Sequence, residues 1–305
     1  MVTTLGDIKG RIKQLLQGYT RNQEQITWLA MGITNLDTTF QVDIGTATAM
    51  SRGLVEIGDE LILVNNFNTS TGLVNVAAGT SGRGRENTTP TSHTLNEIIT
   101  MDPDFPQQRI TEAINQTIQA LYPDLYVMKS YEFPKVAARY EYPMPIDSED
   151  VYRVTCDTIG PSRVWFPAQS WRYNAQASMQ PIDGSPTGKS LQIMDTIVPG
   201  RTIRVMYYTK PGQLVSNSDD YETVVGLPER TIDMVMYGAT ARLLSGVESA
   251  RLQQKSVEST ERAPLVPTGA ASNASQYFWK MYTQRFNEEV DRQHQLFPTF
   301  QTFLA

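Results

Sequence analysis

Apolar residues recur every three or four positions in four segments of the chain, and this period predicts amphipathic helices. The segments are residues 5–16, 104–122, 227–247 and 275–295. Asp104 is a suitable N-cap for the second helix, and Pro123 follows its end. The apolar stripes of the two middle helices predict a buried core at Ile110, Ile114, Ile118, Leu121, Ile232, Val235, Ala239 and Leu243.

Two longer regions alternate apolar with polar residues and are rich in Val, Ile, Thr and aromatic residues. Gly, Asn, Pro, Asp and Ser interrupt the runs at short intervals, as expected for turns between antiparallel strands. The pattern therefore predicts an α+β chain with two antiparallel β modules. We place the boundaries at residues 1–20 (amphipathic helix), 21–102 (small β module), 103–127 and 222–295 (helical segments), 128–221 (second β module) and 296–305 (extended tail).

The tail is unusually apolar for the end of a chain, where solvent exposure is normal. Its candidate docking residues are Leu296, Phe297, Pro298, Phe300, Phe303 and Leu304. Such a segment is explained if it docks onto another chain and places anchor residues in apolar pockets. The alternative is that it folds back on its own core.

Composition narrows the class of protein. The chain has 305 residues, of which 40% are hydrophobic and 19% charged, as in ordinary globular proteins. No apolar run is long enough for a membrane span, and the single Cys156 is compatible with assembly in a reducing cytoplasm. The net charge of −6 argues against sequence-independent DNA binding, which needs a basic surface.

Candidate catalytic groups are sparse, so we expect no enzyme, no cofactor and no metal site. The segment Gly184–Ser190 resembles a phosphate-binding loop but has three residues between its glycines instead of four, which favours a hairpin turn. His93 and His294 lie in different modules, without a nucleophile motif. The acidic residues Asp219, Asp220 and Glu222 fall in a polar turn and are interpreted as solvated loop charges.

An aromatic group in the second β module leaves two interpretations open. It consists of Trp165, Phe166, Trp171 and Tyr173. Core packing is the stronger interpretation, because large side chains dominate small β cores. A carbohydrate-binding platform is the alternative.

Three blocks carry a family resemblance. RGRENTTPTSHTLNEIITMDPDFPQQRITEAINQTIQALYPDLY has matching positions at Arg83, Gly84, Thr88, Thr89, His93, Leu121, Tyr122 and Pro123. MVMYGATARLLSGVESARLQ contains a Gly-Ala-x-Ala-Arg-Leu-Leu helix, and YFWKMYTQRFNEEVDRQHQLFP is a long helix with a Phe-Pro exit. Together they resemble the head-to-tail connector, or adaptor, proteins of long-tailed bacteriophages, particularly those of actinobacterial hosts. Asn87 and Asn96 stand where that family's pattern has glycine, and asparagine tolerates left-handed turns.

The resemblance implies a structural protein of the virion neck, assembled in the host cytoplasm. It implies a helical-bundle core from residues 103–127 and 222–295, decorated by the two β modules. The family usually forms a ring of twelve copies that contacts the portal protein and the next neck or tail-completion protein. DNA would pass through the ring without specific binding. The alternative function is a tail or baseplate module that binds host-surface carbohydrate.

Overall fold

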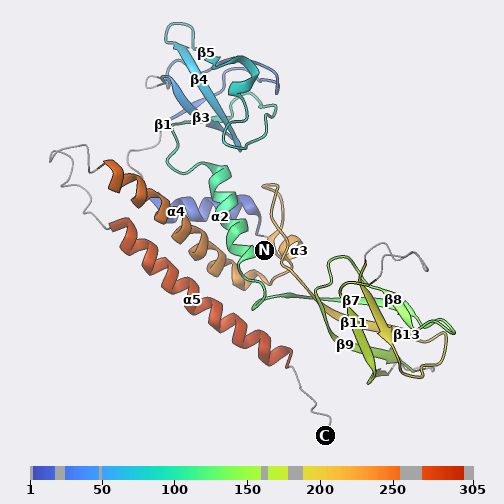
Figure 1. Cartoon of the computed structure of the whole chain (residues 1–305). Helices are drawn as coiled ribbons and strands as arrows, with labels where there is room; N and C mark the ends of the chain where they lie inside the picture. The colour runs from blue at the N-terminus through green and yellow to red at the C-terminus, as the bar shows by residue number, and fades with distance from the viewer. Residues whose placement is uncertain are drawn as a thin grey trace. The chain divides into compact units, whose positions relative to one another are not determined.

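The computed structural model describes residues 3–17, 25–47, 50–158, 164–177, 188–254 and 270–298. The chain divides into two compact units (Figure 1). Unit 1 comprises Met1–Thr117, Leu214–Asp220 and Ile232–Arg285, and unit 2 comprises Ile118–Gln213, Tyr221–Thr231 and Phe286–Ala305. Both units are therefore built from segments that are distant in sequence.

Unit 1 contains a six-stranded antiparallel sheet in the order β1-β6-β3-β4-β5-β2. Its strands are β1 (Gln25–Trp28), β2 (Thr39–Gln41), β3 (Gly53–Ile57), β4 (Glu60–Asn68), β5 (Leu73–Val76) and β6 (Ile98–Met101). The chain just after β1 pairs with the chain just after β2 through an isolated bridge between Leu29 and Val42. This bridge joins the two ends of the sheet, so the strands form a small closed barrel without a long open edge.

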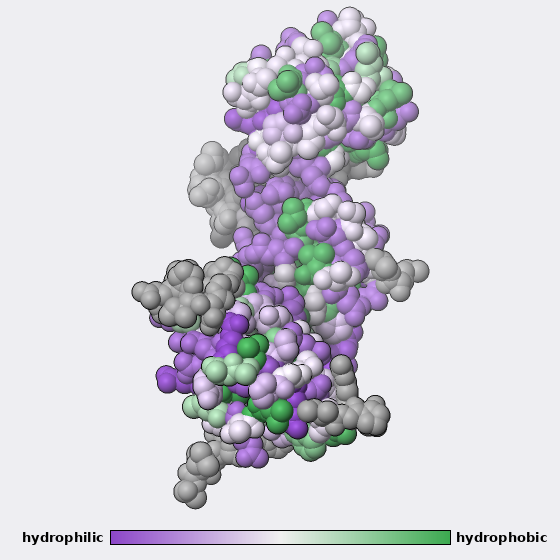
Figure 2. Space-filling view, turned by 90° about the vertical axis from the view of Figure 1, so that its right-hand side faces the viewer, coloured by the Kyte–Doolittle hydropathy of each residue, from purple (hydrophilic) through white to green (hydrophobic). Residues whose placement is uncertain are grey.

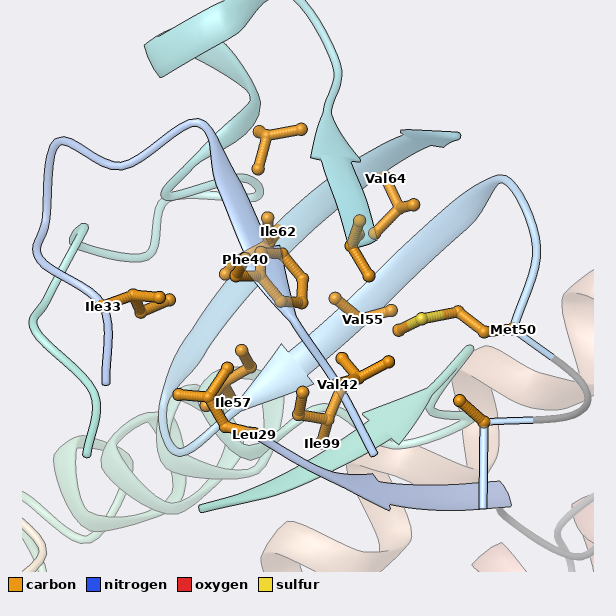
Figure 3. Close-up of a cluster of buried hydrophobic side chains, with 13 residues drawn as sticks. Leu29, Ile33, Phe40, Val42, Met50, Val55, Ile57, Ile62, Val64 and Ile99 are labelled. Atoms are coloured by element: carbon orange, nitrogen blue, oxygen red, sulfur yellow. The ribbon is translucent and has the colours of Figure 1, made fainter. Parts of the chain in front are cut away.

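The barrel encloses a hydrophobic core of its own. Alternate residues of the strands point inward, as a period of two requires. Figure 3 shows these side chains converging from several strands, among them Phe40 from β2, Val55 from β3 and Ile62 from β4. All three have exposed fractions of 3% or less. The alternation in this part of the sequence is thus explained by burial on one side of each strand.

The rest of unit 1 is helical. Its helices are α1 (Leu5–Leu16), most of α2 (Gln107–Gln119), α4 (Ile232–Gln254) and the first part of α5 (Ala270–Leu296). Thr4 begins α1 with a capping box, in which its hydroxyl accepts from the Asp7 amide and the Asp7 carboxylate accepts from the Thr4 amide. Helix α1 packs against α4. Between Ile232 and Leu244 only Asp233 is exposed, so α4 is covered on nearly all sides.

Unit 2 is a sandwich of two antiparallel sheets. One has the strand order β10-β9-β13-β7 and the other β11-β12-β8. The strands are β7 (Val127–Pro134), β8 (Glu141–Pro143), β9 (Asp150–Asp157), β10 (Trp165–Pro167), β11 (Trp171–Asn174), β12 (Ser190–Ile193) and β13 (Thr202–Thr209). Phe133, Tyr142, Leu191 and Val205 belong to the core between the sheets. The unit also holds the short helices α3 (Tyr221–Val225) and η3 (Glu229–Thr231).

The expected helical-bundle core is wrong, although the chain is α+β overall. The described residues form thirteen strands in three antiparallel sheets and five α-helices. Each β region buries its own core, so the β modules are packed bodies instead of decorations on helices. The last helix also contributes little to any core, because Tyr282 and Glu289 are the only buried residues among its described side chains. None of the helices in the described ranges is long and apolar enough to cross a bilayer.

Candidate interaction sites

Four ionisable side chains lie together in the barrel, and three of them are buried. We call Glu60, Arg83, His93 and Glu97 the Glu60 cluster. Arg83 donates from Nε to Glu60 Oε1 over 2.6 Å and from Nη2 to Glu60 Oε2 over 2.8 Å. His93 Nε2 lies 2.9 Å from Glu60 Oε2, and its Nδ1 lies 2.7 Å from Glu97 Oε2. The side chains of Arg83 and Glu60 are completely buried.

The cluster fastens the loop between β5 and β6 to the barrel. The Arg83 guanidinium donates to the carbonyl oxygens of Thr34, Asp37 and Thr91, at 2.8 to 2.9 Å. The Glu60 carboxylate accepts from the amides of Gly84 and Thr91. Both charges are therefore surrounded by partners, which is the condition for burying them.

Gly84 meets a steric requirement of the same loop. Its φ is +61°, and a Cβ atom here would lie 2.6 Å from Pro90 Cδ and 2.8 Å from the Thr88 carbonyl oxygen. Asn87 and Asn96 also have positive φ, of 67° and 68°. Asparagine is one of the residues that tolerate this left-handed conformation. Arg83, Gly84 and His93 thus serve to hold this loop on the barrel.

The contacts within the Glu60 cluster shift the pKa values of its two carboxylates and its imidazole. Burial disfavours the charged Glu60 carboxylate, but hydrogen bonds from Arg83, His93 and the Thr91 amide outweigh it and lower the pKa of Glu60 to about 2. Burial also opposes charging of His93, yet hydrogen bonds to Glu60 and Glu97 raise its pKa above the ordinary value of 6.5. The pKa of Glu97 is lowered, against desolvation, by hydrogen bonds from Thr94 and His93.

We expect the stability of the barrel to depend on pH through His93. A raised pKa means that the stabilisation is full below pH 6.5 and is lost as the pH rises through the folded-state value. The lowered values of Glu60 and Glu97 act oppositely, because their stabilisation is present above about pH 4.5 and is lost on acidification. The unfolding midpoint of the wild type should therefore fall as the pH rises above 6.5.

Thermal unfolding between pH 6 and 9 tests this dependence. His93→Gln should flatten the alkaline fall, since glutamine has no charge to lose. His294→Gln is the matched control, because His294 is exposed near the end of α5. A His93→Gln protein with an unchanged pH profile would show that the cluster does not depend on the His93 charge.

The residues predicted for the helical stripes are all buried. Their exposed fractions are 0% for Ile110, Ile114, Ile118, Leu121, Val235 and Ala239, 2% for Ile232 and 8% for Leu243. Gly238 allows close helix packing in unit 1. A Cβ atom on it would lie 2.5 Å from Thr117 Cγ2 of α2 and 2.9 Å from the Tyr282 ring of α5. This contact explains a glycine in the middle of a helix.

Helix α5 leaves aromatic residues on the surface. Tyr277 and Trp279 are 60% and 46% exposed, although Trp279 also stacks on the Tyr282 ring at 5.0 Å between centroids. On the face drawn in Figure 2, hydrophobic residues form small groups among hydrophilic ones. Exposed aromatic residues of this kind are enriched in protein interfaces.

The start of the C-terminal tail contacts the β-sandwich of unit 2. Leu296 is 62% exposed, whereas the Phe297 ring lies 5.8 Å from the Tyr152 ring of β9, nearly perpendicular to it. The Tyr152 hydroxyl donates to the Pro298 carbonyl over 3.2 Å. The other predicted docking residues, Phe300, Phe303 and Leu304, lie outside the described residues.

The remaining candidates do not form a catalytic arrangement among the described residues. Asp219 accepts from the amides of Val215 and Ser216, as a turn residue does. Residues 178–187, which include most of the phosphate-loop-like segment, lie outside the described residues, and Ser190 begins a strand. His93, considered above for catalysis, is only 6% exposed. No group of metal-ligating side chains occurs in the described ranges.

The aromatic group of the second β module is divided between two sheets. Trp165 and Phe166 lie on β10, and Trp171 and Tyr173 lie on β11. Trp171 and Tyr173 pack against the sandwich core, as core packing predicts. Phe166 is 50% exposed, and the Arg204 guanidinium lies 3.8 Å from the Trp165 ring centroid.

Comparison with known proteins assigns the family. The family described as SU10 adaptor protein matches residues 91–298, about two thirds of the chain. This range includes the end of the barrel, the helices α2 to α5, the whole sandwich and the start of the tail. No curated protein matches the sequence. The match supports a structural, non-enzymatic phage protein that interacts with other capsid or tail proteins, and the chain belongs to the SU10 adaptor protein family.

Proposed function

We propose that this protein is a structural subunit of the phage neck, where copies form a ring that joins the portal to the tail. The family match over residues 91–298 is the observation that carries the proposal. Exposed aromatic residues on α5 provide surface for contacts with neighbouring copies or the next neck protein. The ring would couple head and tail mechanically and leave a channel for the genome.

The charge of the chain is compatible with such a channel. With a net charge of −6, the subunit has no overall attraction for DNA phosphates. A basic wall would retain DNA through counterion release, whereas an acidic one lets it slide. We therefore propose that DNA passes through without being bound specifically.

We assign the contact with the portal to the C-terminal tail. Leu296 is exposed where α5 ends, and the sequence beyond Pro298 contains Phe300, Phe303 and Leu304 within six residues. Several large apolar side chains at a chain end are suited to fill pockets of a partner, where such anchors supply most of the binding energy.

Deleting residues 296–305 should leave the subunit folded and abolish its attachment to the portal protein. The deletion removes the apolar anchors, but the sandwich core and the barrel core lie elsewhere in the chain. Pull-down with purified portal protein measures attachment, and circular dichroism verifies the fold. Attachment retained by the folded deletion protein would refute the assignment.

A matched pair of variants separates side-chain chemistry from tail length. Replacing Phe300, Phe303 and Leu304 with alanine should abolish attachment as the deletion does. Replacing the polar residues Thr299, Gln301 and Thr302 with alanine keeps the anchors and should preserve attachment. Equal losses in both variants would exclude the apolar side chains as the anchors.

A further inference from the structure

The end of α5 is fixed to the β-sandwich of unit 2 by contacts that precede the tail. Gln293 makes two hydrogen bonds to the backbone of Tyr126, which lies just before β7. Its Oε1 accepts from the Tyr126 amide over 3.3 Å, and its Nε2 donates to the Tyr126 carbonyl over 2.6 Å. One amide side chain thus satisfies both polar groups of one backbone residue, much as a neighbouring strand would.

A row of aromatic rings continues from this point to the tail. The rings of Tyr126 and Tyr208 lie 4.3 Å apart, those of Tyr208 and Tyr152 6.0 Å, and those of Tyr152 and Phe297 5.8 Å, between centroids. Tyr208 follows the buried Tyr207 on β13, so its side chain points away from the sandwich core. The row therefore lies on the outer face of this sheet.

The same tyrosine that meets Phe297 also binds the chain beyond it. The Tyr152 hydroxyl donates to the Pro298 carbonyl, while the Phe297 amide donates to the Gln293 carbonyl over 2.9 Å and closes the last turn of the helix. Phe297 is half-buried although it lies after the end of α5. We call the contacts of Gln293 with Tyr126, and of Tyr152 with Phe297 and Pro298, the tail-root contact.

We propose that the tail-root contact is a positioning element, which holds Phe297 and Pro298 at one fixed point on the sandwich and so presents the C-terminal tail to its partner. Tyr152 and Gln293 are the positioning residues. The inference rests on the proposed portal contact and adds how this chain presents its tail. A segment whose root is held loses less conformational freedom on binding than one that starts from a free end, and it binds more tightly for that reason.

Three variants at tyrosine positions test the proposal in the full-length chain. Tyr152→Ala removes both the ring contact with Phe297 and the hydrogen bond to Pro298. Tyr152→Phe keeps the ring and loses only the hydrogen bond. Tyr140→Ala is the control, because Tyr140 belongs to the same unit, is 64% exposed and has its ring against the Lys135 ammonium, 5.1 Å from the ring centroid.

Hydrogen exchange of the peptide that spans residues 290–298 reports on the contact directly. Tyr152→Ala should speed exchange of the Phe297 amide at least severalfold, because its helical hydrogen bond would no longer be held by the ring. Tyr152→Phe should show an intermediate increase, and Tyr140→Ala none. Unchanged exchange in Tyr152→Ala would overturn the tail-root contact as a positioning element.

Affinity for purified portal protein gives the functional readout. Tyr152→Ala should bind about tenfold more weakly than the wild type. Tyr152→Phe should lose less affinity than Tyr152→Ala, and Tyr140→Ala should bind as tightly as the wild type. Equal or tighter binding by Tyr152→Ala would contradict positioning, and tighter binding would show that the sandwich withholds the tail.

The two proposals fail in different ways. If the deletion of residues 296–305 leaves portal binding intact, the proposed tail function is wrong, whereas hydrogen exchange still decides whether Tyr152 holds the tail root. If the deletion abolishes binding and Tyr152→Ala binds normally, only the positioning inference is wrong. Gln293→Ala, on the half-buried side of the helix end, provides the same test should Tyr152→Ala fail to fold.

Discussion

Replacing Arg83 with methionine should lower the free energy of unfolding of the barrel by about 3–5 kcal/mol, the usual cost of removing one partner from a buried ion pair. The substitution keeps most of the side-chain volume but leaves the Glu60 carboxylate without its two shortest hydrogen bonds. It also leaves the carbonyl oxygens of Thr34, Asp37 and Thr91 without their guanidinium donor. Urea denaturation measures the loss.

Arg85→Met is the control for this prediction. Arg85 is two residues away and exposed, and its Nη1 donates a long hydrogen bond of 3.5 Å to the Ser81 carbonyl. Its replacement should change stability by less than about 0.5 kcal/mol, as at most surface positions. If both substitutions cost the same, the Glu60 cluster does not hold the loop on the barrel.

The second large effect is expected at Gly238, where alanine should destabilise unit 1 by about 1–3 kcal/mol through overpacking. The added methyl group would meet Thr117 Cγ2 at 2.5 Å and the Tyr282 ring at 2.9 Å. Thr117 cannot easily turn away, because its hydroxyl donates to the Ala113 carbonyl and accepts from Arg242 Nε. The helices must therefore move apart.

Gly246→Ala, in the same helix, should stabilise unit 1 instead of destabilising it. The nearest atom to a Cβ there is Arg109 Nη2 at 3.9 Å, which is ordinary contact. In an open helical position, alanine is favoured over glycine by about 0.5–1 kcal/mol. Thermal unfolding of the Gly238→Ala and Gly246→Ala proteins measures whether each is less or more stable than the wild type. Stabilisation by Gly238→Ala would contradict the close packing of α2, α4 and α5.

The spacing of apolar residues predicts helices and strands well where each of them buries only one face. The first helix runs over residues 5–16, as its apolar spacing predicts. The apolar residues from Ile110 to Leu121 recur at the spacing of one helix face, and that face is buried as this spacing predicts. Turn chemistry was also informative, since Asn87 and Asn96 adopt the left-handed conformation for which asparagine is suited.

The way in which these elements pack depends on contacts between distant residues, and here the expectation of a helical-bundle core failed. The spacing of apolar residues predicts which segments form helices or strands, but not which of them hold the larger core. Closure of the barrel depends on the bridge between Leu29 and Val42, which no local pattern signals. The family resemblance placed α5 in the bundle core, yet Phe278, Met281 and Phe286 are only half-buried.

The Glu60 cluster was missed for the same reason. Glu60 is 23 residues from Arg83 and 33 from His93 in sequence, so their proximity is a property of the fold. One signal was available: Glu60 begins the apolar run Glu60–Val64, and an acidic residue that is buried in such a strand needs a charged partner. The first family-like block supplies that partner in Arg83.

Cryo-electron microscopy of intact particles would show where in the virion this protein lies. We expect the barrel and the sandwich of this chain to fit density in a ring between the portal and the tail, with residues beyond Pro298 in contact with the portal. Density for this chain at the baseplate, or its absence from the junction between head and tail, would show that the protein is not an adaptor of the neck.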